Sequence, residues 1–156
     1  MYQDFTDLLF AFHAHNVKYL IVGGYAVSFH AQPRATKDID LFIKADPSNA
    51  TAVYSALAAF GAPMDEIELA DLADPRQFIR FGREPIAIDI LPSIDGVEFD
   101  GAWDRRVESV IDVKTGLKAY FISREDLIAS KLAAGRARDL ADVEEIRDAI
   151  ANTDRP

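Results

Sequence analysis

The sequence contains no cysteine, which excludes a disulfide framework, a thiolate nucleophile and any zinc or iron–sulfur site held by cysteine. Only three histidines occur, His13, His15 and His30, so a metal site built mainly from imidazoles is not expected. No apolar run approaches the roughly 20 residues that span a bilayer. An acid, Asp4, stands where a secretory signal would carry basic residues, and we therefore expect a cytoplasmic protein without a membrane segment.

Positive charge is scarce as well, because 17 Lys and Arg stand against 26 Asp and Glu, a formal net charge of −9. Such a surface repels nucleic-acid phosphates at long range, which disfavours non-specific DNA binding but permits a local basic cleft. The most acidic stretch, residues 65–74, holds five carboxylates and no base, which is typical of a solvated loop or helix face. A length of 156 residues is enough for one domain with its own core.

Hydrophobic spacing predicts helices and strands that follow one another through the first 122 residues. In chain order the predicted elements are a helix at 4–15, a strand at 18–22, a helix at 25–30, a strand at 39–43, a helix at 48–60 and two strand pairs, 77–81 with 86–91 and 107–113 with 117–122.

The last part of the chain changes character. Ser123-Arg-Glu-Asp126 is a capping box that predicts a helix start, Gly135 is expected to end that helix, and apolar spacing predicts a final helix at 138–150. These elements predict an α+β fold in which helices flank a mixed central sheet, with a C-terminal helical pair. We expect a core at residues 1–122 and a helical extension at 123–156, packed together as a single domain.

The most informative stretch is Lys37-Asp38-Ile39-Asp40-Leu41. Residues two apart share one face of a strand, so Asp38 and Asp40 project side by side while Ile39 faces the core. Two neighbouring carboxylates repel each other unless one is protonated or a cation lies between them, and a divalent cation with oxygen ligands meets that need. The alternative for this pattern alone is a solvated strand edge that carries two acids.

A third carboxylate, Asp89, is the only charge in the apolar run 86–91. Burying a lone carboxylate is costly unless it is paired or binds a metal, and the alternative is a position at an open sheet edge. With Asp38 and Asp40 it gives three acids on two strands that converge on one face. That arrangement suits two Mg²⁺ ions in phosphoryl transfer.

Gly23 and Gly24 follow one predicted strand and precede a predicted helix. Glycines at such a point let the backbone approach a ligand closely, and a helix N-terminus offers free N–H groups to a phosphate. A plain tight turn is the alternative, and the pattern is neither a P-loop nor a dinucleotide-binding glycine motif.

The order of these motifs resembles the nucleotidyltransferase fold of the DNA polymerase beta superfamily. A hydrophobic strand leads to Gly-Gly, 13 residues separate Gly24 from Asp38, and a later hydrophobic strand carries Asp89. The resemblance implies that Asp38 and Asp40 bind Mg²⁺ or Mn²⁺, and that Asp89 is a further metal ligand or the general base. It also implies that Gly23 and Gly24 hold the triphosphate of a nucleotide such as ATP.

The stretch 131–142 is similar to the Lys…Arg-Asp-x-x-Asp signature of small bacterial nucleotidyltransferases, among them the AbiE-type toxins of type IV toxin–antitoxin systems, and residues 33–37 fit the same group. The catalytic residues that the two resemblances imply are Asp38, Asp40, Asp89, Lys131 and Asp142. The nucleotide-binding residues that they imply are Gly23, Gly24, Arg34, Thr36, Lys131, Arg136 and Arg138.

Simpler interpretations stand beside these roles. Lys131 has the alternative of a solvated lysine, and Arg138 and Asp142, four apart, are expected as a helix-surface pair if they have no role in the site. Asp139 has the alternative role of capping the last helix. Arg34 either neutralises the triphosphate or pairs with Asp38. Four further residues are expected to be packing residues: His30, Phe99, Trp103 and Tyr120.

The function that follows is a metal-dependent nucleotidyltransferase, which transfers a nucleoside monophosphate from a nucleoside triphosphate to an acceptor hydroxyl and releases pyrophosphate. The likeness to AbiE-type toxins implies tRNA or another RNA as acceptor and a cognate antitoxin as partner. The alternatives are nucleotidylation of a small molecule, as in antibiotic resistance, and a non-catalytic or antitoxin-like module that binds a partner protein. The acceptor, whether RNA, protein or small molecule, is left open.

Overall fold

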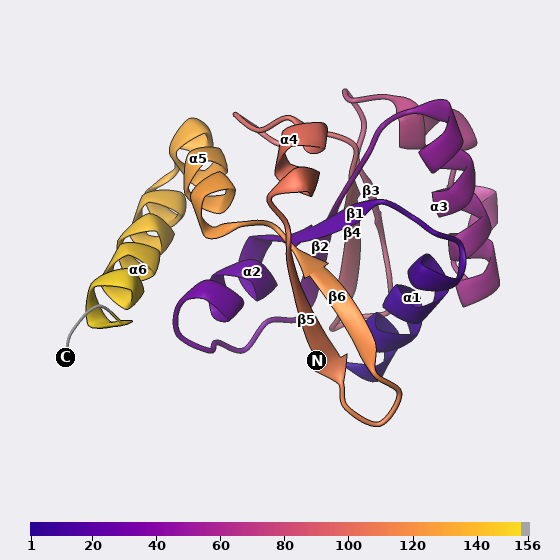
Figure 1. Ribbon diagram of the computed structural model, residues 1–156. Coiled ribbons are helices and arrows are strands. Elements are labelled where there is room, and N and C mark those ends of the chain that lie inside the picture. The colour runs from indigo at the N-terminus through magenta and orange to yellow at the C-terminus, as the bar shows by residue number, and fades with distance from the viewer. Residues whose placement is uncertain (154–156) are drawn as a thin grey trace.

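The computed structural model describes residues 1–153, and its centre is a mixed sheet. The strands are β1 (Tyr19–Val22), β2 (Asp38–Ile43), β3 (Ile79–Phe81), β4 (Ala87–Leu91), β5 (Val107–Asp112) and β6 (Leu117–Phe121). They lie in the order β3-β4-β2-β1-β6-β5 (Figure 1). The pairs β1–β6 and β2–β4 are parallel, and the pairs β1–β2, β3–β4 and β5–β6 are antiparallel.

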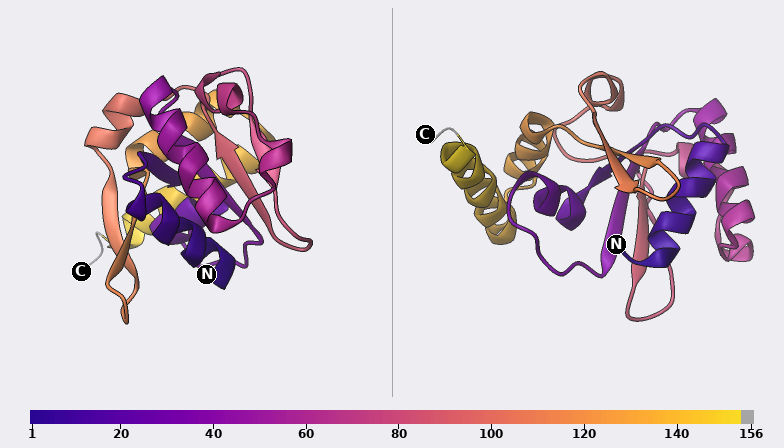
Figure 2. Two further views of the ribbon diagram at one scale, coloured as in Figure 1. Left: turned by 90° about the vertical axis from the view of Figure 1, so that its right-hand side faces the viewer. Right: turned by 60° about the horizontal axis from the view of Figure 1, so that its bottom comes forward.

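Helices cover both faces of the sheet. They are α1 (Gln3–Ala14), α2 (Gly23–His30), α3 (Pro47–Phe60), α4 (Phe99–Asp104), α5 (Arg124–Ala134) and α6 (Ala137–Thr153), with short 3₁₀ turns η1 (Met64–Glu66) and η2 (Leu69–Ala73). α1 and α3 lie on one side of the sheet, and α2, α5 and α6 lie on the other (Figures 1 and 2). The predicted α+β class, with a mixed sheet and a C-terminal helical pair, is confirmed. In residues 1–153 no helix is both long and apolar enough to cross a membrane.

Side chains along β2 alternate between the two faces of the sheet. Ile39, Leu41 and Ile43 are fully buried in the core shared with α1 and α3. Phe42 points to the opposite face, into the smaller core beneath α2, α4 and α5. Because side chains two apart share a face, Asp38 and Asp40 lie on the same face as Phe42, toward α2 and the C-terminal helices. The hydrophobic half of β2 thereby anchors the strand that carries the two acids.

Local signals set the helix boundaries. Asp46 caps α3 by accepting a hydrogen bond from the Asn49 backbone N–H (2.7 Å), Pro47 fills its first position, and Gly61 ends it in the left-handed conformation. Ser123 caps α5 in the same way, as the capping box predicts.

Some predicted helix boundaries differ from the structure, and one helix was not predicted. α2 begins at Gly23 rather than at residue 25, because the two glycines already form its first turn. α6 extends to Thr153, beyond the predicted end at residue 150. α4 was not predicted, since six residues that include a glycine carry too little periodicity to indicate a helix.

Asn49 of α3 links the residue before β1 to the residue after β2. Its side chain accepts from the Lys18 N–H (2.8 Å) and donates to the carbonyl oxygens of Lys18 (3.0 Å) and Lys44 (2.9 Å), and it is 7% exposed. Asn49→Ala removes three hydrogen bonds to backbone groups at a buried position, and we expect it to lower the free energy of unfolding by about 2–3 kcal/mol. Urea denaturation measures the loss, with the exposed Thr51→Ala on the same helix as control. A loss equal to that of the control would contradict this role.

Candidate active site

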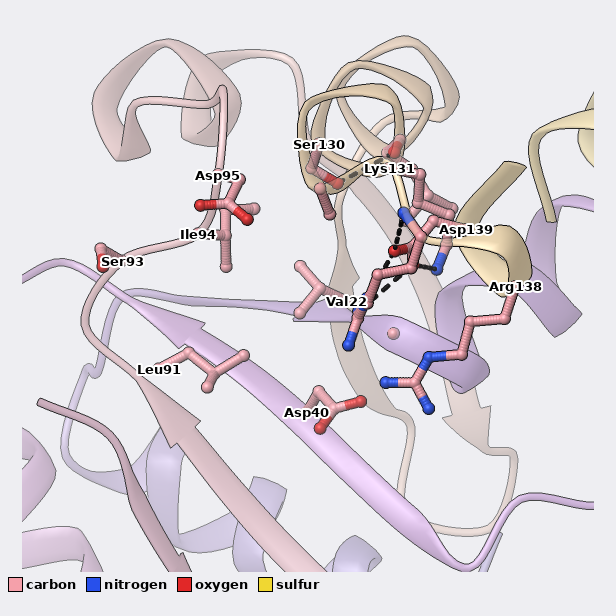
Figure 3. Close-up of a pocket in the computed structure, with 14 residues that line it drawn as sticks. Val22, Asp40, Leu91, Ser93, Ile94, Asp95, Ser130, Lys131, Arg138 and Asp139 are labelled. Carbon is pink, nitrogen blue, oxygen red and sulfur yellow. Dashed lines mark hydrogen bonds and ion pairs between the residues drawn. The ribbon is translucent and has the colours of Figure 1, made fainter. Parts of the chain in front are cut away.

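Two adjoining hollows lie between the sheet and the C-terminal helices. The larger, here called the carboxylate cleft, has a volume of about 510 Å³ and includes Gly23, Gly24, Asp38, Asp40, Arg80 and Asp89 in its lining. The smaller, here called the side pocket, has a volume of about 340 Å³ (Figure 3). Both hollows are lined by Gly23, Asp40, Lys131, Arg136, Arg138 and Asp139. These six residues therefore form a wall that the two hollows share.

Strand register brings the predicted carboxylates together. β2 and β4 run parallel with Asp40 beside Asp89 and Asp38 beside Ala87, so the three acids share one face of neighbouring strands. Asp89 is 7% exposed. Burial raises the pKa of Asp40, and the hydrogen bond and charge of Asp89 and the charge of Asp38 raise it further. The two neighbouring carboxyls therefore favour a shared proton or a cation.

Arg80 was not predicted as a site residue, yet it contacts two of the three acids. It lies opposite Asp89 in the β3–β4 pair. Its Nη1 donates to both carboxylate oxygens of Asp89 (3.1 and 2.9 Å), and its Nη2 donates to Oδ2 of Asp38 (3.4 Å). The charges of Asp89 and Asp38 raise the pKa of Arg80 above its usual value. The predicted hairpin of 77–81 with 86–91 already places Arg80 and Asp89 on one face, which is the signal that would have found it.

The two glycines bring the start of α2 against the acids. Gly23 has φ +66°, and a Cβ at this position would overlap the Asp40 carboxylate. A Cβ on Gly24 would lie 3.0 Å from Cγ2 of Thr36. No side chain caps the N-terminus of α2, so its first N–H groups are free to bind an anion. The glycines are therefore needed for close approach, and the site combines acids with an anion-binding helix end.

The basic residues of the C-terminal signature form ion pairs with acids of the same region. Lys131 pairs with Asp142 (2.9 Å) and Asp139 (3.5 Å), and Arg136 pairs with Asp139 (2.6 Å). The Lys131 side chain is 12% exposed, so the expectation of a solvated lysine is wrong. Lys131 instead lines both hollows with its charge already partnered.

Two pairings that the sequence left as alternatives differ in the structure. Arg34 pairs with Asp142 (2.9 Å) and Glu145 (2.8 Å) rather than with Asp38, because the loop before β2 runs beside α6. Asp142 is consequently paired with Arg34 and Lys131 and not with Arg138.

Asp139 is not the N-cap of the last helix but lies in the first turn of α6. There its carboxylate accepts from the Arg136 backbone N–H (3.2 Å). It therefore satisfies an N–H at the helix start while it also holds the side chains of Lys131 and Arg136.

Arg138 differs from its basic neighbours. Within residues 1–153 no ion pair or hydrogen bond of its side chain is present, and Figure 3 shows it extending from α6 toward Asp40. Thr36 lies against Gly24, and its hydroxyl donates to the Arg34 carbonyl oxygen (3.4 Å). Both residues line the carboxylate cleft.

The residues expected to pack do so. His30 Nε2 lies 2.8 Å from the Ile122 carbonyl oxygen, and Phe99 is buried. Trp103 and Tyr120 are half-buried and meet edge to face, with their ring centroids 5.2 Å apart.

The donor set fits a divalent cation in its chemistry, because Mg²⁺ prefers carboxylate oxygens and the acids outnumber their one guanidinium partner. As the side chains lie, no group of three or more Asp, Glu or His residues in the described chain is arranged around a single ion position. Arg80 holds oxygens of Asp38 and Asp89 instead.

Comparison with known proteins assigns the family. The chain belongs to a nucleotidyltransferase family, because the model described as "Nucleotidyltransferase of unknown function (DUF6036)" matches residues 4–154. No curated protein matches the sequence.

Two solved structures are similar at 17% identity. One is the lincosamide antibiotic adenylyltransferase LnuA in its lincomycin-bound form, with a TM-score of 0.58 over 96% of this chain and 98% of that chain. The other is an antigenic nucleotidyltransferase-like protein from Paracoccidioides brasiliensis, with a TM-score of 0.54 over 95% of this chain and 75% of that chain. These similarities confirm the nucleotidyltransferase fold. They do not identify the AbiE-type toxin group.

The crowded acids predict a pH-dependent stability. Burial and neighbouring charges raise the pKa of Asp40 to about 7. A carboxyl whose pKa rises on folding stabilises the folded state while it is protonated, and this contribution is lost as the pH rises through the folded-state pKa. Asp40→Asn resembles the protonated side chain and does not titrate. We expect its gain in the free energy of unfolding over the unsubstituted protein to be about 2 kcal/mol larger at pH 8.5 than at pH 5.

Urea denaturation of both proteins at the two pH values, in buffer with a chelator, measures this difference. Asp65→Asn in the acidic stretch outside the cleft is the matched control. An equal gain for Asp40→Asn at both pH values would show that Asp40 does not titrate in this range.

Proposed function

We propose that this member of the nucleotidyltransferase family transfers a nucleoside monophosphate from a nucleoside triphosphate to a hydroxyl of a small-molecule acceptor. The observation that carries the proposal is the parallel register of β2 and β4, which sets Asp40 beside Asp89 next to Gly23. Paired acids beside an uncapped helix start provide both halves of a site for a metal-bound triphosphate.

In this proposal Asp38, Asp40 and Asp89 hold Mg²⁺ or Mn²⁺, which neutralises charge on the triphosphate when bound. The first N–H groups of α2, at Gly23 and Gly24, hold phosphate oxygens. The acceptor oxygen forms a bond to the α-phosphorus, the bond between the α-phosphorus and its bridging oxygen breaks, and pyrophosphate leaves. Asp89 is the candidate to take the proton of the acceptor hydroxyl, because its carboxyl group lines the same cleft.

Basic residues of the C-terminal helices and of the loop before β2 supply the remaining phosphate contacts. Arg138 faces Asp40 without an ion-pair partner in residues 1–153 and meets the triphosphate directly. Lys131 and Arg34 reach it once the anionic phosphates compete with Asp142 for their charge. The core at residues 1–122 thus supplies the acids and Arg34, and the C-terminal helices supply Lys131 and Arg138.

The side pocket favours a small acceptor. It has a volume of about 340 Å³, and its lining combines apolar side chains with hydroxyls: Val22, Leu91, Ile94, Leu127, Ser93 and Ser130. Small-molecule sites are commonly of this size and mixed character. LnuA, which shares the fold, is named for adenylyl transfer to lincosamide antibiotics. A net charge of −9 opposes the approach of a long RNA, the acceptor that the AbiE likeness implies.

The acceptor is tested by incubation with each labelled nucleoside triphosphate and Mg²⁺, in separate reactions with lincosamides, the small-molecule fraction of a cell extract, total RNA and protein. Label in a small molecule is expected. Label in RNA, together with growth arrest on expression that Asp40→Ala abolishes, would favour the toxin function instead. The absence of label in every fraction would favour a partner-binding module.

Activity depends on the two facing acids. Asp40→Asn and Asp89→Asn each remove one anionic ligand while keeping the shape of the side chain, and we expect kcat to fall by about 10³-fold or more. Steady-state release of pyrophosphate measures the loss, and Asp65→Asn again serves as control. Turnover within tenfold of the unsubstituted protein would refute the assignment of the acids.

Arg138 is expected to bind nucleotide without supporting the fold. Arg138→Gln should weaken the binding of a nucleoside triphosphate with Mg²⁺ about tenfold, as loss of one charged phosphate contact does, and should leave the unfolding free energy unchanged. Calorimetric titration gives the Kd. Arg147→Gln, on the same helix but paired with Glu144 on the surface, is the control. Equal Kd values for the two variants would remove Arg138 from the nucleotide site.

A further inference from the structure

The guanidinium of Arg80 occupies the carboxylate oxygens on which the proposed metal site depends. It engages both oxygens of Asp89 and one oxygen of Asp38. These contacts neutralise part of the charge of the two acids, and they use the oxygens that a divalent cation would also need. A cation that binds these oxygens must therefore displace Arg80 from them.

The placement of Arg80 allows such an exchange. It lies on β3, a three-residue strand at the edge of the sheet, and its side chain is 51% exposed, whereas the Asp89 side chain is 10% exposed. Asp89 is therefore held within the sheet, whereas Arg80 is a long and largely exposed side chain. The backbone of β3 need not move for the guanidinium to leave, because rotation about side-chain bonds suffices.

The charge balance of the cleft favours a divalent cation over Arg80 at these oxygens. Asp38, Asp40 and Asp89 share the single positive charge of Arg80, and Asp40 has no ion-pair partner in the described chain. A divalent cation brings twice the charge of the guanidinium to the same oxygens. The proposed triphosphate, in the same cleft, would offer the released guanidinium new anionic partners.

We propose that Arg80 is an internal counter-ion, which holds Asp38 and Asp89 in the absence of metal and is displaced when a divalent cation binds. The inference rests on the proposed function and assigns Arg80 as a positioning residue of that site. It follows that the protein binds a divalent cation weakly on its own, since each binding event first breaks the Arg80 pairs. Removing the guanidinium therefore strengthens metal binding, although it removes a contact from the site.

The test is Mn²⁺ binding to the whole chain without nucleotide, measured from the electron paramagnetic resonance signal of free Mn²⁺. Arg80→Gln is expected to bind Mn²⁺ about tenfold more tightly than the unsubstituted protein, because competition for the oxygens is lost. Arg80→Lys, which keeps the charge but not the forked geometry, is expected to fall between the two. Arg76→Gln, whose ion pair joins it only to Asp74, is the control and should not change the affinity.

Thermal unfolding provides a second readout that does not require activity. With a chelator, Arg80→Gln should melt at a lower temperature than the unsubstituted protein, because Asp89 loses its partner. Saturating Mn²⁺ should raise its melting temperature more than it raises that of the unsubstituted protein. A role confined to fold stability predicts only the first of these changes.

The outcomes separate this inference from the proposed function. If Arg80→Gln binds Mn²⁺ equally or more weakly while the unsubstituted protein binds Mn²⁺ with nucleotide and transfers label, the counter-ion inference is wrong and the proposed function stands. If no protein binds Mn²⁺, with or without nucleotide, and no transfer occurs, both are wrong.

Discussion

The repulsion between Asp40 and Asp89 is the constraint on which the arrangement of the site depends. Parallel pairing of β2 with β4 sets the half-buried Asp40 carboxyl beside the buried Asp89 carboxyl. Apolar side chains at these two positions would stabilise the fold better. A fold gains no stability from such a pair. Three features reduce the cost of the negative charge of this pair: Arg80 from the edge strand, the positive end of α2, and the raised pKa of Asp40. Arg80 and the start of α2 stabilise negative charge at the site, whereas the raised pKa of Asp40 means that a negative charge there is still unfavourable in the absence of a cation.

Gly23 makes the helix contribution possible. A side chain at this position would overlap the Asp40 carboxylate, and φ +66° disfavours any other residue there. The start of α2 can therefore lie directly against the acids, where its free N–H groups and partial charge act at short range. The apolar half of β2, with Ile39 and Leu41 fully buried, fixes the other side of this contact. Packing on one face of the sheet thus holds the electrostatic geometry on the other face.

Local sequence signals predicted most of this fold and the acids of the candidate site. Alternation along β2 and β4 put Asp38, Asp40 and Asp89 on one face, and the capping box at Ser123 placed α5. What the sequence did not predict depends on contacts between distant segments. The pair of Arg34 with Glu145 spans 111 residues, and no local pattern indicates it. The predicted hairpin places Arg80 on the face of Asp89, but which residue lies directly opposite Arg80 depends on hairpin register, which the sequence of the turn leaves open.

The charge of the cleft differs from that of the chain as a whole, and this difference bears on how an acidic protein could bind the proposed triphosphate. The chain carries −9, yet six basic side chains stand against five acidic ones in the lining of the carboxylate cleft. Most of the basic ones are already paired with acids, so the cleft is nearly neutral rather than strongly attractive. A free anion gains little there. In the proposed function, a nucleotide that arrives with a divalent cation would satisfy the acids and the basic residues together, and the paired charges would thereby select for the metal-bound nucleotide.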